Sequence, residues 1–206
     1  MKEPTKEIVA GLILRYPALS VCQDDILSAF DALSNSFKRG GKLLVCGNGG
    51  SAADAEHIVG ELLNKFKKHR PILPSIAERL PQELASKLMG ALPAVSLVSM
   101  TGFLSAAAND INWDVAFAQE AMGLASANDV LIAISTSGNS QNCVYAAQVV
   151  KAKGGTAMAL TGSLPSKLSQ VCDISIRVPA VETFKIQELH LPVYHTLCAM
   201  LEEELF

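Results

Sequence analysis

Short apolar runs alternate with segments of helical periodicity along most of the 206-residue chain. Strands that alternate with helices form βαβ units with right-handed crossovers, and such units build a parallel sheet covered by helices. The pattern therefore predicts an α/β fold with a doubly wound parallel sheet and N-terminal helices. The predicted strands are 42–46, 94–98, 130–135, 156–161 and 174–178. The predicted helices are 6–15, 22–39, 51–67, 115–125, 139–153 and 185–204.

One stretch, residues 69–93, interrupts this alternation. It contains four prolines, at positions 71, 74, 81 and 93, and a short helix is predicted at 81–89. Connections of this length are uncommon inside compact domains, so the stretch is interpreted as a lid or an oligomer contact. We expect residues 1–41 to form a helical segment that packs in an oligomer, and residues 42–206 to form one domain that carries the insertion.

Composition and charge limit the class of protein. Hydrophobic residues make up 50% of the chain and charged residues 18%, which favours a large core over disorder. A net charge of −3 argues against a protein that binds nucleic acid directly. The five cysteines are scattered and form no CxxC motif, which indicates reduced thiols in a reducing compartment. With no predicted signal peptide or membrane span, we expect a cytoplasmic protein with no membrane partner.

A glycine-rich loop, residues 47–51 (GNGGS), joins the first predicted strand to a helix. Glycines let backbone N–H groups point inward, and the N-terminus of the following helix attracts an anion. The loop matches neither the Walker A motif nor GxGxxG, so a nucleotide site is disfavoured. Two interpretations stay open here, a phosphate-binding loop and a tight turn in which Ser51 caps the helix.

A second loop, residues 135–140 (STSGNS), also lies between a strand and a helix and carries four hydroxyl groups. Hydroxyls at a helix N-terminus can hold a phosphate without a lysine, although an ordinary Ser/Thr turn has a similar composition. Ligands of doubly wound sheets bind beyond the carboxyl ends of the strands, where the strand order reverses. If the two preceding strands are neighbours, both loops face one crevice and can share one phosphate.

Ionisable side chains recur at helical spacing in two places. His57 and Glu61 are four residues apart in one predicted helix, and Gln187 and His195 lie two turns apart in the last one, with His190 between them. Such groups provide a general base, a general acid and metal ligands. Spacing alone equally fits a surface salt bridge for the first pair and a core histidine for His195.

Several of these segments together resemble the phosphoheptose isomerases of the SIS superfamily, whose sheet is flavodoxin-like. The resemblance runs from about residue 42 to the C-terminus, and the combination of His57 and Glu61 with Gln187 and His195 is its most specific part. That combination separates the isomerases from the similar replication-initiator-associating proteins, which lack the glutamate. The matching segments are 42–51 (KLLVCGNGGS), His57 with Glu61, Asn109-Asp110, 134–140 (ISTSGNS), 160–162 (LTG) and 186–195 (IQELHLPVYH).

The resemblance implies an aldose–ketose isomerase that interconverts sedoheptulose 7-phosphate and D-glycero-D-manno-heptose 7-phosphate through an enediol. Glu61 is then the base and His195 the acid/base, and the enzyme is a homotetramer or, failing that, a homodimer. The residues expected to bind zinc, as in several family members, are His57, Glu61, Gln187 and His195. The residues expected to contact the phosphorylated sugar are Asn48, Gly49, Gly50, Ser51, Asp110, Ser135, Thr136, Ser137, Ser140 and Gln187.

Three departures from the family pattern keep an alternative open. Lys65 stands where an arginine is usual, Phe184 replaces an aspartate, and the segment between Arg70 and Asn109 is longer by about twenty residues. The substrate could therefore be another phosphorylated sugar. The alternative function is a non-catalytic SIS module that binds a protein partner, of the replication-initiator-associating type, or senses a phosphosugar.

Overall fold

The computed structural model describes residues 1–206 and contains one five-stranded sheet in which every strand pair is parallel. The strand order is β2-β1-β3-β4-β5, so the chain runs from β1 to β2 at one edge and returns to β3 on the other side of β1. This is the flavodoxin-like, doubly wound order, and the predicted fold class is confirmed. The strands are β1 (Leu43–Gly47), β2 (Ala94–Ser96), β3 (Val130–Ile134), β4 (Thr156–Thr161) and β5 (Ile174–Arg177).

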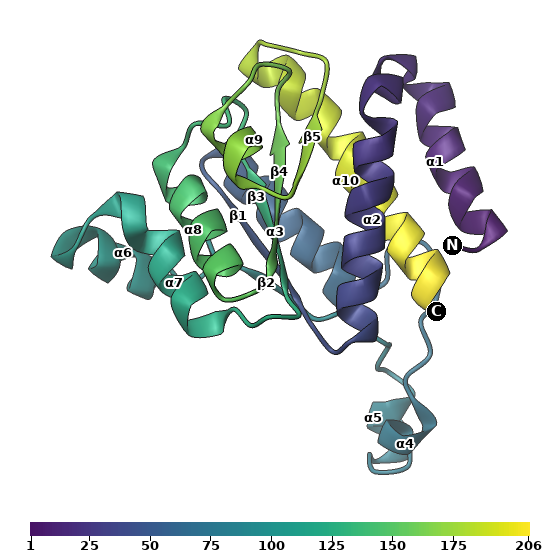
Figure 1. The fold of residues 1–206 in the computed structure, drawn as a ribbon. Helices are drawn as coiled ribbons and strands as arrows, with labels where there is room; N and C mark the ends of the chain where they lie inside the picture. The colour runs from purple at the N-terminus through teal and green to yellow at the C-terminus, as the bar shows by residue number, and fades with distance from the viewer.

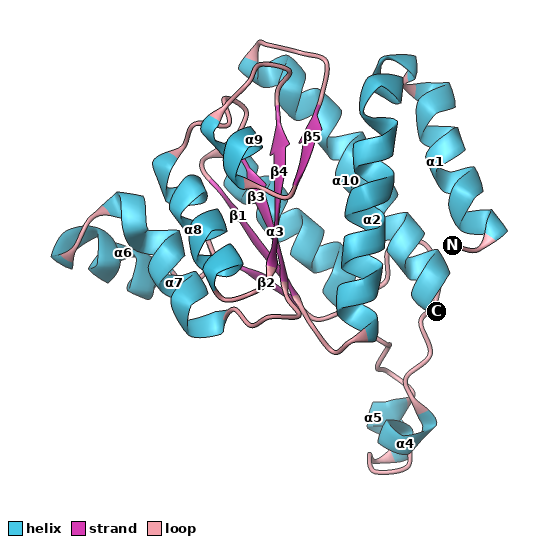
Figure 2. Ribbon diagram, in the orientation of Figure 1, coloured by secondary structure: helices cyan, strands magenta, loops and turns pink.

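Helices cover both faces of the sheet (Figure 2), and the two core clusters reflect the alternation of side chains along the strands. Leu43 and Val45 of β1 belong to one cluster, whereas Leu44 and Cys46 belong to the other. The first cluster includes residues of α1 (Glu3–Arg15), α2 (Gln23–Lys38), α3 (Gly50–Leu63) and α10 (Thr183–Leu205). The second includes residues of α6 (Thr101–Asp110), α7 (Ala116–Leu124), α8 (Gln141–Ala152) and α9 (Lys167–Val171).

Some helix boundaries differ from those predicted. α3 ends at Leu63 rather than at residue 67, because Asn64 is extended and the next N–H groups bond to a side chain of α10. α6 and α9 were not among the predicted helices. α9 has only five residues and depends on a capping box between Ser166 and Ser169, which hydrophobic periodicity does not report. Two 3₁₀ turns, Pro17–Cys22 and Trp113–Val115, precede α2 and α7.

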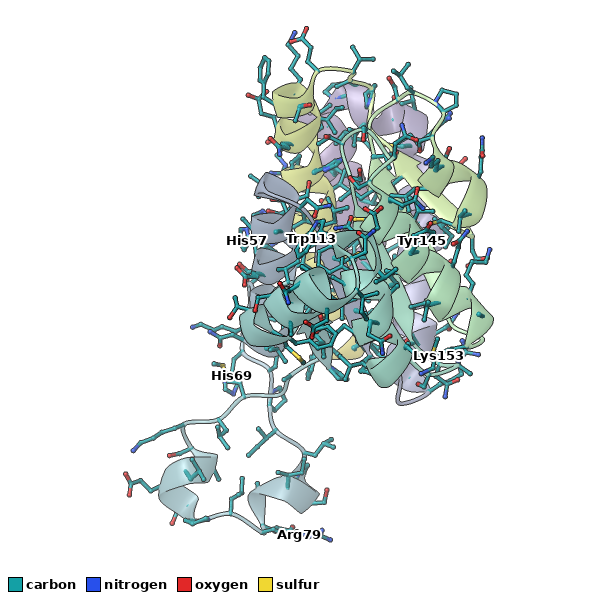
Figure 3. All side chains as sticks on the ribbon, turned by 90° about the vertical axis from the view of Figure 1, so that its left-hand side faces the viewer. His57, His69, Arg79, Trp113, Tyr145 and Lys153 are labelled. Carbon is teal, nitrogen blue, oxygen red and sulfur yellow. The ribbon has the colours of Figure 1, made fainter.

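The insertion forms an appendage, residues 71–92, that projects from the body below the sheet (Figure 1). It contains α4 (Pro74–Ala77) and α5 (Gln82–Ala85), so the single helix predicted at 81–89 is wrong in extent. Neither helix buries a side chain, and Arg79 lies at the far end of the appendage (Figure 3). The two ends of the appendage meet at its base, where the Gly90 N–H donates to the Arg70 carbonyl at 2.8 Å.

The five cysteines are all free thiols, and four of them are buried. Cys46 and Cys143 lie in the second core cluster, and Cys22 and Cys198 lie in the first. None of the helices combines the length and the apolar character that crossing a membrane requires.

Candidate active site

The glycine-rich loop joins β1 to α3 and is held against two other elements. Gly49 has φ of +57°, a backbone conformation that side-chain-bearing residues rarely adopt. A Cβ on Gly50 would lie 2.6 Å from the Gln187 amide nitrogen, so the absence of a side chain lets α10 approach the loop. The Asn48 amide exchanges hydrogen bonds of 3.0 and 2.9 Å with the Asn142 amide of α8. The loop is therefore pinned between the last helix and the helix that follows β3.

The hydroxyl-rich loop lies beside it, because β3 pairs directly with β1. Ser135 is buried, and its hydroxyl lies 3.0 Å from the Ser140 hydroxyl at the start of α8. Gly138 has φ of +65° and packs closely against Ser166. A cavity of about 200 Å³ lies beside this loop, and its lining includes Thr136, Ser137, Gly162, Ser163 and Ile186. Hydroxyls and a helix N-terminus at this edge can hold an anion without any lysine.

Three ionisable side chains converge between α3 and α10. His57 Nε2 lies 3.1 Å from Glu61 Oε1 and 3.4 Å from His195 Nε2. One potential ligand atom from each of the three residues falls within 4.8 Å of the others. Burial, followed by the nearby His57, lowers the pKa of His195. A neutral imidazole beside a carboxylate is suited to moving protons and to binding a metal ion.

Two residues that the sequence did not point to extend this cluster. The Tyr194 hydroxyl donates to Asp54 Oδ1 at 3.1 Å and lies 3.0 Å from His57 Nδ1. Burial, together with the Asp54 carboxylate, raises the pKa of Tyr194, so the hydroxyl keeps its proton. Because that proton points to Asp54, His57 Nδ1 must be the donor toward the tyrosine oxygen. The free lone pair of neutral His57 is then on Nε2 and faces Glu61 and His195.

This arrangement places electron-rich atoms against one another. Two imidazole nitrogens and a carboxylate oxygen cannot lie this close without a proton or a cation between them, and such a donor set suits zinc. Gln187 lies eight residues before His195, which is about 12 Å along the helix. It makes no hydrogen bond with the three converging residues, and its amide lies against Gly50 instead.

The remaining predicted residues lie elsewhere. Asp110 is exposed at the end of α6, on the other layer, where its carboxylate accepts a hydrogen bond from the Asn109 amide at 2.8 Å. Lys65 and Phe184 are both exposed. Phe66 was not predicted to belong to the site, yet its ring lies 5.2 Å from the His195 ring and gives the cluster one apolar wall. Its signal in the sequence is weak, since it follows the helix that carries Glu61.

Comparison with known proteins shows what the chain is similar to. Two SIS domain families match it, one over residues 99–201 and the other over residues 18–91. The phosphoheptose isomerase of Rhodospirillum rubrum is 37% identical over 187 residues, which are 91% of this chain and 89% of the relative. The phosphoheptose isomerase of Akkermansia muciniphila is 32% identical over 206 residues, with 100% of this chain and 99% of the relative covered.

Solved structures agree with these relatives. The phosphoheptose isomerase of Neisseria gonorrhoeae superimposes with a TM-score of 0.76 at 30% identity and covers 94% of both chains. That of Francisella tularensis superimposes with a TM-score of 0.77 at 29% identity, over 92% of this chain and 91% of the other. The sheet order, the paired loops and these similarities agree, and the chain belongs to the phosphoheptose isomerase family of SIS-domain enzymes.

Proposed function

We propose that this phosphosugar isomerase interconverts sedoheptulose 7-phosphate and D-glycero-D-manno-heptose 7-phosphate. The observation that carries the proposal is the convergence of His57, Glu61 and His195 in a member of this family. The names of the relatives support a seven-carbon substrate, and the hydroxyl-rich loops support its phosphate. The retained Glu61 favours an enzyme over a non-catalytic SIS module.

In the proposed reaction the Glu61 carboxylate removes a proton from C1 of the ketose and returns it to C2. His195 donates a proton to the C2 oxygen and accepts one from the C1 oxygen, which completes the passage through the enediol. Burial and the nearby His57 lower the pKa of His195, which favours an imidazole that accepts the C1 hydroxyl proton and then delivers it to the C2 oxygen. Phe66 covers one side of His195 and limits access of water to the enediol.

The donor set fits a metal ion, and we propose that His57, Glu61 and His195 hold zinc. Gln187, the fourth ligand that the resemblance implies, lies against Gly50 in this chain, so in an assembly it would complete the site from a neighbouring chain. Zinc would supply Lewis acidity toward the sugar oxygens. The Tyr194 hydroxyl and the Asp54 carboxylate would hold His57 in the tautomer that binds metal through Nε2.

We further propose that the sites are shared within a homotetramer, with a dimer as the alternative assembly. Gly50 and Glu61 are eleven positions apart in α3, which is about 16 Å of helix. An extended seven-carbon sugar phosphate spans only about 9 Å from C1 to phosphorus, judged from ordinary bond lengths. If the phosphate loop of one chain faced Glu61 of a neighbouring chain, the two could lie at this shorter distance. Residues 1–41 would then pack between the chains. The free thiols support a reducing location, which we infer to be the cytoplasm.

The test follows isomerisation by NMR with sedoheptulose 7-phosphate and with a panel of other sugar phosphates. We expect turnover with the heptose, and a loss of about 10²- to 10⁴-fold in Glu61→Gln, because the base is removed. Glu56→Gln is the matched control, since Glu56 lies on the same helix and is exposed. No turnover with any substrate, with or without added zinc, would favour the binding-module alternative instead.

A further inference from the structure

Arg70 at the base of the appendage is fully buried, although it carries a charge. Its guanidinium donates from Nη2 to the Glu61 carbonyl at 2.8 Å and from Nη1 to the Leu62 carbonyl at 2.6 Å. These carbonyls belong to the last turn of α3, where no intrahelical donor is available. Arg70 therefore caps the helix at the residue that carries the proposed base.

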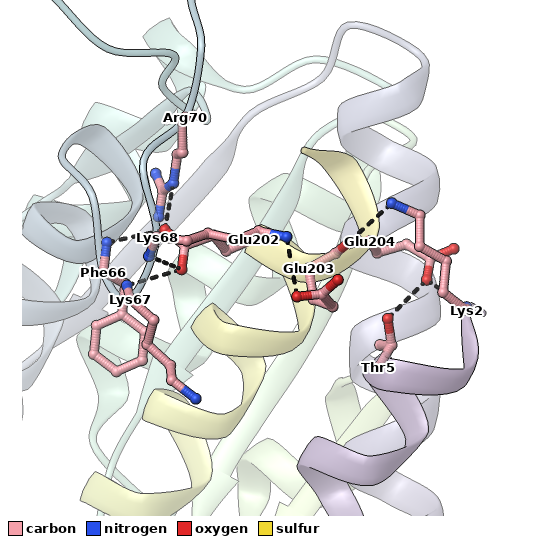
Figure 4. A network of polar contacts seen from close by, with 9 residues as sticks. All are labelled: Lys2, Thr5, Phe66, Lys67, Lys68, Arg70, Glu202, Glu203 and Glu204. Atoms are coloured by element: carbon pink, nitrogen blue, oxygen red, sulfur yellow. Dashed lines mark hydrogen bonds and ion pairs between the residues drawn. The ribbon is translucent and has the colours of Figure 1, made fainter.

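The third contact of Arg70 reaches α10. Its Nε donates to Glu202 Oε1 at 2.8 Å, and Glu202 is itself 1% exposed (Figure 4). The Glu202 carboxylate also accepts the backbone N–H groups of Phe66, Lys67 and Lys68, at 3.0, 2.8 and 3.1 Å. Burial would raise the pKa of Glu202, but these N–H groups and the guanidinium outweigh it and hold that pKa below its ordinary value.

This pair joins the two helices of the candidate site. Glu202 lies seven residues after His195, two turns along α10, so both side chains project on the same side of that helix. Arg70 bonds directly to the backbone of Glu61, and Phe66, whose ring faces His195, is held by the same carboxylate. The orientation of Glu61 toward His195 is thus linked to one buried ion pair.

Energetics favour a positioning role over a purely stabilising one. A buried ion pair recovers little more than the free energy that its desolvation costs, so replacing the whole pair by apolar groups is often neutral for stability, whereas removing one partner alone destabilises the fold. Catalytic geometry is more sensitive, because a misplacement of about 1 Å can cost roughly 10²-fold in rate.

We propose that Arg70 and Glu202 form a positioning pair that holds the Glu61 carboxylate and the Phe66 ring against His195. This inference rests on the proposed isomerase function for its kinetic consequence, but its structural consequence is independent of activity. It assigns a role to the base of the appendage without requiring α4 or α5 to touch the substrate.

The test compares Arg70→Met, Arg70→Lys and Glu202→Gln with the wild-type protein. We expect kcat to fall by about 10- to 100-fold in Arg70→Met and Glu202→Gln, with KM changed by less than about 2-fold. Arg70→Lys, which restores a charge but not the forked set of donors, should recover only part of the loss. Lys68→Met is the matched control. Lys68 lies in the same loop as Arg70, and its side chain pairs with Glu203 at 3.0 Å but does not reach Glu61, so kcat of this variant should stay unchanged.

The second measurement does not depend on substrate. Side-chain ¹H–¹⁵N spectra of the four histidines should show altered His57 and His195 signals in Glu202→Gln and Arg70→Lys, with His190 unchanged. If the wild-type protein turns over no sugar, these shifts alone still decide the positioning role. The proposal would be overturned if the folded variants showed the His57 signals of the wild-type protein. It would also be overturned if KM rose and stability fell while kcat stayed at the wild-type value. If Arg70→Met does not fold, the two conservative variants provide the same decision.

Discussion

The His57 imidazole has different partners on its two nitrogens. Nδ1 faces the Tyr194 hydroxyl, and Nε2 faces Glu61 and His195. Since the tyrosine proton is directed to Asp54, the protein sets the tautomer of His57 through a residue that never needs to touch substrate. A single hydroxyl therefore controls which nitrogen of His57 is available in the candidate site.

Removing that hydroxyl in Tyr194→Phe should lower both turnover and zinc affinity by about 10- to 100-fold, the range found for residues that hydrogen-bond to metal ligands. The buried phenyl ring keeps its packing, so we expect a stability loss of only about 1 to 3 kcal/mol. Turnover assays and competition titrations with a zinc chelator measure the two effects. Tyr145→Phe is the control, because Tyr145 lies on the surface of α8 (Figure 3) and should change neither. Unchanged zinc affinity in Tyr194→Phe would contradict this role.

A second residue-scale prediction concerns Glu120 in α7, whose carboxylate is buried without a hydrogen-bond partner. Burial raises its pKa from 4.5 to about 7. The folded state therefore holds the proton more tightly than the unfolded state. This stabilisation is fully present below pH 4.5 and is lost as pH rises through 7.

Glu120→Gln should accordingly be more stable than the wild-type protein at pH 8, by about 1 to 3 kcal/mol, and nearly equal to it at pH 5. Urea unfolding at the two pH values measures the difference. Glu188→Gln, at an exposed position on α10, should show no such pH-dependent gap. An equal gap at both pH values would mean that Glu120 does not titrate in this range.

At the scale of single elements, the β3–α8 loop depends on one backbone conformation. Gly138 has φ of +65°, and a Cβ there would collide with the side chain of Ser166, which caps α9. The loop hydroxyls and the start of α8 are therefore arranged around a position that accepts only glycine.

Gly138→Ala should cost about 1 to 3 kcal/mol of stability through backbone strain, and it should weaken binding of inorganic phosphate at least 10-fold. Thermal unfolding and a phosphate titration followed by NMR measure the two effects. Gly102→Ala in α6 is the control, since a Cβ there meets no other atom within 4 Å. Wild-type phosphate affinity in Gly138→Ala would show that this loop does not hold the anion.

At the scale of the whole molecule, apolar side chains remain exposed at the end of α1 and in the turn that follows. The side chain of Leu14 is 83% exposed and that of Val21 is 73% exposed. A cavity of about 660 Å³ lies between α1 and α10 and includes His195 in its lining. An assembly that covered this cavity would also enclose His195.

We therefore expect light scattering at micromolar concentration to give the mass of a homotetramer. Leu14→Lys with Val21→Lys should shift the protein toward smaller species, because charges would enter a covered apolar surface. Lys151→Met, at an exposed position of α8 in the opposite layer, is the comparison and should leave the mass unchanged. A wild-type monomer would contradict the proposed assembly.

The alternation of apolar runs was enough to predict the fold class, because each strand and helix leaves its own period in neighbouring residues. The two loops, and the pairing of His57 with Glu61, could likewise be predicted, since turn chemistry and i,i+4 spacing are local. The same local signals were too weak for α6 and α9, and they extended α3 past its true end, where contacts from α10 replace intrahelical bonds.

The strand order and the long-range contacts could not be predicted from local patterns. The loops after β1 and β3 share an edge only because those strands pair, although Gly47 and Val130 are 83 positions apart in the chain. His57 meets Tyr194 across 137 positions, and Arg70 meets Glu202 across 132. These contacts depend on how the whole chain packs, because each buried polar group needs a hydrogen-bond partner. The periodicity of neighbouring residues carries no information about which distant residue provides that partner.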